Sequence, residues 1–73
     1  MNGNVANYRI HAKDRAVLVT IMRQVKSHYA RVGEYNSDNY ELNAQNKTLT
    51  LTGVHPPVVE RACQGFSCKK VQF

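Results

Sequence analysis

The sequence has no tryptophan, only two prolines and no long hydrophobic run. A membrane-spanning helix needs about 20 apolar residues, and the longest apolar stretch, AVLVTIM at residues 16 to 22, is far shorter. The N-terminal segment MNGNVANYRI also lacks the basic start of a secretory signal peptide. We therefore expect a soluble cytoplasmic protein without a membrane partner.

The two cysteines, Cys63 and Cys68, are too few for the disulfide framework that small secreted domains usually carry. We expect reduced thiols, although one disulfide between them is compatible with the sequence. A metal site would need clustered ligands, and no CxxC or HxxxH spacing is present. We expect no metal and no cofactor from the cysteines or from the histidines His11, His28 and His55.

Acidic residues are also scarce. Five Asp and Glu stand against ten Lys and Arg, which gives a formal net charge of +5. This balance favours anionic partners, either nucleic acid or an acidic protein surface. A chain of 73 residues indicates a single domain, residues 1 to 73, with a flexible segment at residues 1 to 5. So short a chain leaves little room for a deep active-site cleft.

The first half of the chain predicts a strand followed by a helix. Tyr8 and Ile10 alternate with polar residues from Asn7 onward, which is typical of a half-buried strand. Asp14 suits a helix N-cap and Gly33 a left-handed helix end. Between them, one apolar stripe is expected to be buried: Leu18, Ile21, Met22, Val25, Tyr29 and Val32.

Two further strands are predicted from Tyr40 to Ala44 and in KTLTLTG, residues 47 to 53. A two-residue turn at Gln45 and Asn46 would close a hairpin, with an Asn in the left-handed position. Its register places Tyr40 opposite Leu51 and Leu42 opposite Leu49, so that all four apolar side chains share one face.

The last part of the chain predicts a short helix and an edge strand. HPPVVERACQG has Pro56 or Pro57 in its first turn, where a missing amide hydrogen is harmless, and Gly65 as its stop. KKVQF alternates Val71 and Phe73 with polar residues, so it predicts a final strand.

The order of these elements predicts an α+β fold, a small ferredoxin-like (split βαβ) antiparallel sheet of three to four strands with two helices on one face. The covered face would hold Tyr8, Ile10, Tyr40, Leu42, Leu49, Leu51, Val71 and Phe73. The open face would hold Arg9, His11, Glu41, Thr48, Thr50, Thr52 and Lys70.

No motif in the chain indicates an enzyme. The loop HAKD after the first strand lacks the glycines with which ferredoxin-like phosphatases hold phosphate, and no nucleophile has a marked base beside it. RNA-recognition motifs need aromatic rings on their third strand, where KTLTLTGV has threonines. Non-specific contact with nucleic-acid phosphates by the basic side chains remains the alternative function.

The predicted long helix carries a second stripe beside the buried one: Arg15, Val19, Arg23, Lys26 and Ala30. Val19 gives this basic stripe a small apolar centre, which suits a protein partner because apolar contact supplies affinity while charges steer the encounter. The candidate partner-binding residues are Arg15, Val19, Arg23 and Lys26, with Tyr8, Arg9 and Lys70 as outlying candidates.

Two resemblances add to this reading. Residues 40 to 73 are weakly similar to the second half of a BON domain, through the TLTLTG strand followed by a helix and a closing strand. The whole chain, which begins MNGNVANYRIHAKDRAVLV, resembles in length, charge and organisation the small transcription regulators of tailed phages, among them phages of Xanthomonas.

The phage resemblance implies a monomeric, non-enzymatic regulator in the host bacterial cytoplasm. Such a protein binds host RNA polymerase through its β′ and β subunits, inhibits σ-dependent promoter use and promotes antitermination. No motif aligns the contact residues of that family with this chain, so the candidates named above rest on physical reasoning alone.

Overall fold

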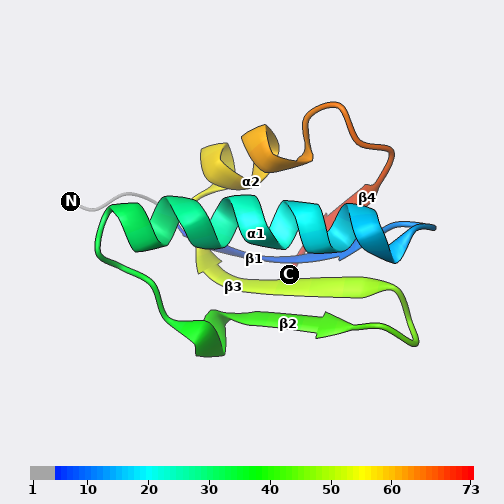
Figure 1. Cartoon of the computed structure of the whole chain (residues 1–73), viewed down its shortest axis with the longest axis horizontal. Coiled ribbons are helices and arrows are strands. Elements are labelled where there is room, and N and C mark those ends of the chain that lie inside the picture. The colour runs from blue at the N-terminus through cyan, green and yellow to red at the C-terminus, as the bar shows by residue number, and fades with distance from the viewer. Residues whose placement is uncertain (1–4) are drawn as a thin grey trace.

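The computed structural model describes residues 5 to 73 and contains one sheet and two α-helices (Figure 1). The elements are β1 (Ala6–His11), α1 (Arg15–Arg31), the 3-10 turn η1 (Ser37–Asn39), β2 (Tyr40–Asn43), β3 (Thr48–Val54), α2 (Pro56–Cys63) and β4 (Lys69–Gln72). The four strands pair antiparallel in the order β2-β3-β1-β4. The predicted α+β ferredoxin-like arrangement is confirmed, including its fourth strand. Of the segment expected to be flexible, residues 1 to 4 lie outside the described residues.

Helix α1 begins and ends where its capping residues predict. The Asp14 carboxylate accepts a hydrogen bond from the backbone N–H of Ala16 at 2.9 Å, which satisfies one of the free donors of the first turn. At the other end Gly33 has a φ of 78°, and the N–H of Glu34 donates to the carbonyl of Tyr29 at 2.8 Å. This pattern is a Schellman motif, which stops the helix.

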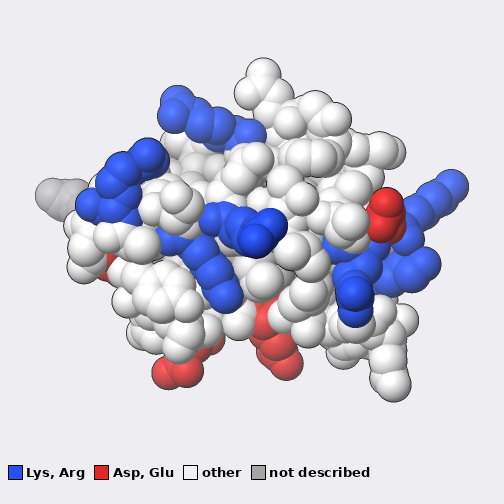
Figure 2. Space-filling model, in the orientation of Figure 1, with Lys and Arg blue, Asp and Glu red and all other residues white. Residues whose placement is uncertain are grey.

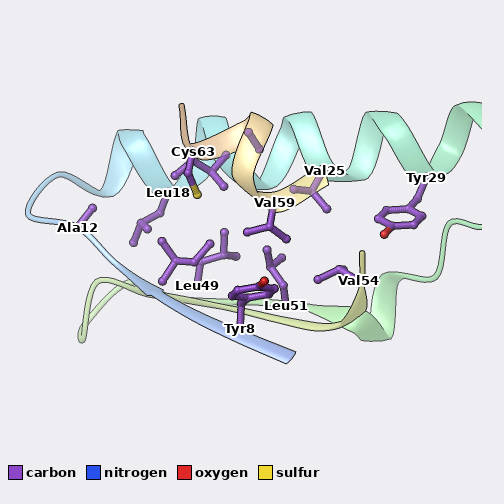
Figure 3. Close-up of a cluster of buried hydrophobic side chains, with 13 residues drawn as sticks. Tyr8, Ala12, Leu18, Val25, Tyr29, Leu49, Leu51, Val54, Val59 and Cys63 are labelled. Atoms are coloured by element: carbon purple, nitrogen blue, oxygen red, sulfur yellow. The ribbon is translucent and has the colours of Figure 1, made fainter. Parts of the chain in front are cut away.

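The core lies between the sheet and the helices (Figure 3). Leu18, Ile21, Val25 and Tyr29 of α1 are buried, as the helical stripe predicts. The prediction for Val32 is wrong: its side chain is 52 % exposed, because this residue is the C-cap of α1 and lies past the last helical turn.

The hairpin of β2 and β3 has the predicted register, with Tyr40 opposite Leu51 and Leu42 opposite Leu49. The turn itself differs. Strand pairing ends at Asn43, and the left-handed residue is Lys47, with a φ of 52°, instead of an asparagine. The Asn43 side chain accepts a hydrogen bond from the N–H of Asn46 at 3.1 Å, which fixes Asn46 within the turn and leaves the left-handed position to its neighbour.

Strand β4 forms, but the prediction of its faces is wrong. Lys70 pairs with buried Ile10 and lies on the helix side of the sheet, whereas Val71 pairs with exposed Arg9. The reason is the preceding Cys68, which packs against the core and sets the phase of the strand, since alternate residues point the same way. Phe73 follows Val71 on the open face, and these side chains are 55 % and 49 % exposed.

Candidate protein-binding surface

The outer side of α1 is basic and has no acid of its own, because the helix RAVLVTIMRQVKSHYAR contains neither Asp nor Glu. Arg15 and Arg23 are exposed, while Val19 and Lys26 are half-buried on the flank of the helix. Figure 2 shows Lys and Arg side chains spread over α1 and α2, with the acidic ones at the margins of this face. The structure therefore places all four helix candidates on one accessible element.

These four residues do not form one patch. The Lys26 ammonium lies 5.7 Å from the centre of the Tyr40 ring, so this side chain leans toward the start of β2. Arg23 lines a groove on the other side of the helix, against α2. The stripe seen in the sequence thus divides between two flanks of α1.

The three outlying candidates lie apart from the helix surface. Tyr8 is 6 % exposed and belongs to the core. Arg9, its neighbour in β1, points to the opposite face of the sheet, where its guanidinium lies 4.7 Å from the centre of the Phe73 ring. Lys70 is bound to Glu60 of α2, with 2.7 Å between Nζ and Oε1. None of the three joins the helix candidates.

A groove runs between α1 and α2 and encloses about 510 Å³. We call it the α1–α2 groove and define it by its lining residues: Arg23, Gln24, Ser27, His28, Arg31, Pro57, Val58, Arg61 and Ala62. Proline, valine and alanine side chains of α2 form an apolar wall, and three arginines surround it. Arg31 and Arg61 were not among the candidates predicted from the sequence.

Among residues 5 to 73, no carboxylate forms an ion pair with the arginines of the groove. Glu60 is the only acid of α2, and it pairs with Lys70, which is the only ion pair among residues 5 to 73. The hydrogen bond that the Lys70 ammonium donates to the Glu60 carboxylate raises the pKa of Lys70, so this lysine stays charged at neutral pH and holds Glu60. The positive charge of Arg23, Arg31 and Arg61 is therefore available to an external anion.

No family model, curated protein or solved structure matches the chain.

The two cysteines do not build a reactive site. Both thiols are free, and Cys63 is buried in the last turn of α2. Burial, together with the neighbouring Cys68, raises the pKa of Cys63 to about 12. A thiol with so high a pKa is protonated at neutral pH and is a poor nucleophile.

Residues 5 to 73 contain no cluster of three or more His, Cys, Asp or Glu that could hold a metal ion. None of the helices in this range is both long enough and apolar enough to span a bilayer.

Alkaline pH should destabilise the fold, because three groups hold their protons more tightly in the folded chain. Burial raises the pKa of Cys63 and of Tyr40, and Glu60 raises that of Lys70. The contribution of each group to the free energy of unfolding is complete below its pKa in the unfolded chain, which is about 9 for a thiol. This contribution is lost as the pH rises toward and through the pKa in the folded chain. We expect the urea midpoint to fall from pH 8 to pH 11.

The variant Cys63→Ala serves as the control for this pH effect. It removes one of the three groups, so its urea midpoint should fall less steeply over the same pH range. A wild-type midpoint that stays constant up to pH 11 would contradict the burial of this thiol.

Proposed function

We propose that this protein is a non-enzymatic transcription regulator that binds host bacterial RNA polymerase through the basic surface of α1 and α2. The observation that supports the proposal is the set of three arginines around an apolar wall, none of which pairs with an acid in the described part of the chain. The β′ and β subunits of the polymerase are the proposed partners, as the resemblance to phage regulators implies. The proposed result of binding is inhibition of σ-dependent promoters and antitermination.

The chemistry of the surface favours a protein partner. Protein interfaces combine a desolvated apolar centre with a polar or charged rim. The α1–α2 groove has both parts, since Val58 is half-buried between exposed Arg23 and Arg61. Charges at such a rim raise the association rate and fix the orientation of the partner.

Non-specific binding of DNA or RNA is the second candidate, and the open face of the sheet favours it. Arg9, His11 and Lys69 are exposed there, and the exposed Phe73 ring lies under the Arg9 guanidinium. Basic side chains beside an accessible aromatic ring are typical of surfaces that bind single-stranded nucleic acid.

Affinity capture tests the first proposal. The immobilised protein should retain the β and β′ subunits from a bacterial lysate treated with nuclease, at about 0.15 M salt, where charges more than about 8 Å apart are largely screened. An apolar contact makes such retention less sensitive to salt than phosphate binding, whose affinity falls log-linearly with salt. If the protein retained only nucleic acid from an untreated lysate and nothing after nuclease treatment, this result would favour the second candidate.

A further inference from the structure

We propose that the α1–α2 groove binds an acidic amphipathic helix of a partner protein, with one apolar side chain against α2 and carboxylates on the flanking arginines. This inference rests on the proposed function in that it names the chemistry of the partner's contact segment. It differs from the sequence-based interpretation, which centred the contact on Arg15, Val19, Arg23 and Lys26 and included neither Arg31 nor Arg61.

The size and lining of the groove suit a side chain better than a whole element. Its volume of about 510 Å³ lies within the range of about 300 to 1,000 Å³ that is usual for ligand sites. Pro57, Val58 and Ala62 provide the apolar wall on the α2 side. A leucine or similar side chain of a partner would lose contact with water here, and this burial supplies affinity.

The arginines determine the sign of the charge that the partner segment must carry. Arg23, Arg31 and Arg61 lie around the groove, and the only acid of α2 is bound to Lys70. A guanidinium group presents a planar set of donors that matches a carboxylate in a bidentate hydrogen-bonded pair. A segment with Asp or Glu beside its apolar side chain complements all three positions.

The spacing of two arginines indicates how far apart the acidic residues of the partner helix should be. Arg23 and Arg31 are eight residues apart in α1, which corresponds to about 12 Å along a helix at 1.5 Å per residue. Two acids about seven or eight residues apart on a second helix span a similar length. An apolar residue midway between them lies on the same face, at i+3 or i+4.

A phosphodiester backbone fits the same charges less well. It would pair with the arginines, but it has no apolar group for the wall that Val58 and Ala62 form. Phosphate contacts also carry little geometric specificity, since they position a nucleic acid without reading it. The combination of an apolar wall with arginines favours a peptide.

Fluorescence anisotropy with a defined probe tests the inference. The probe is a fluorescein-labelled peptide of about 15 residues, long enough for partial helix formation, with two glutamates about seven residues apart and a leucine midway. We expect saturable binding to the wild-type protein. Exchange of the leucine for serine, or of both glutamates for glutamine, should weaken binding by about tenfold, the loss expected for about 1.4 kcal/mol of contact.

Two single-charge variants locate the site. Arg61→Ala should weaken probe binding by about tenfold, since a charge-assisted hydrogen bond is lost from the groove. Lys13→Ala removes an equal charge from the loop before α1, outside the groove, and it should change binding by less than about twofold. Circular dichroism should show that both variants stay folded, because both side chains are exposed.

Several results would overturn the inference. The first is absence of saturable binding, and the second is an equal loss of affinity in Arg61→Ala and Lys13→Ala. The third is binding of equal strength by the serine peptide or by an unlabelled RNA oligonucleotide. Polymerase capture is measured separately with the same variants. If the probe binds as expected but no polymerase is retained, the groove inference stands and the proposed partner is wrong. If polymerase is retained but the probe does not bind, the proposed partner stands and the groove inference is wrong.

Discussion

Replacing Leu49 with aspartate should unfold the protein. Leu49 has no exposed surface and lies in β3 between Ile10 of β1 and Leu42 of β2. An ionised carboxylate at this position would be buried without a partner, at a cost of several kcal/mol, and the leucine contacts would be lost as well. A domain of this size has a total stability of about 4 to 11 kcal/mol. Far-UV circular dichroism and a thermal melt should show loss of the cooperative transition.

The control for this variant is Thr52→Asp. Thr52 is in the same strand, but its side chain is exposed on the open face of the sheet. The new carboxylate stays in water there, so this variant should keep its cooperative melt. If Leu49→Asp melted at a temperature close to that of wild type, the assignment of the two sheet faces would be wrong.

The double charge reversal Arg23→Glu with Lys26→Glu should abolish most polymerase binding while the protein stays folded. Both side chains project from the middle of α1, and neither is in an ion pair among the described residues. The reversal replaces attraction with repulsion against an acidic partner surface, for which we expect a loss of about 100-fold, or ~3 kcal/mol. The exposed charge of Arg23 contributes only about 0 to 1 kcal/mol to folding, and loss of the contact between half-buried Lys26 and the Tyr40 ring adds about 0.5 to 1 kcal/mol. Biolayer interferometry with purified polymerase and a urea titration measure the two effects.

A matched control changes the net charge by the same amount elsewhere. Lys13 and Lys47 are exposed in neighbouring loops, joined by a hydrogen bond from the N–H of Ala12 to the carbonyl of Lys47 at 3.4 Å. Lys13→Glu with Lys47→Glu should keep most of the polymerase affinity. If both double variants lost binding equally, net charge rather than the helix surface would explain the interaction.

Most of the fold could be predicted because local signals agreed with one another. Asp14 and Gly33 mark the ends of α1, and the apolar stripe between them identifies its buried side. Leu42 and Leu49 fix the hairpin register, since any shift by one residue would expose an apolar side chain. Each of these features depends on residues close together in the chain.

Strand β4 could not be predicted as well, because its orientation depends on contacts outside its own sequence. Val71 and Phe73 look like core residues by hydrophobicity alone. The packing of Cys68 and the ion pair of Lys70 with Glu60 determine which side faces the helices. A lysine stem can lie along apolar surface while its ammonium group reaches a carboxylate, so a charged residue at this edge has little cost.

The candidate site was predicted only in part. The basic character of α1 was visible in the sequence, whereas the groove depends on which flank of α1 meets α2. In the structure the flank with Gln24, His28 and Arg31 lines the groove against α2, and this flank is defined only once both helical connections have been placed on the sheet. The groove could therefore be predicted only from the topology, and Arg61 could be named as a groove residue only after the two helices had been placed.

The strand order also determines when folding can finish during protein synthesis. Among the elements described here, β1 leaves the ribosome first, but it pairs on one side with β3 and on the other with β4, the last of these four strands in chain order. Until β4 arrives, the backbone amides of β1 along that side have no partner. A nascent chain that stalls before Lys69 therefore presents an open strand edge, which can recruit a chaperone or pair with another chain.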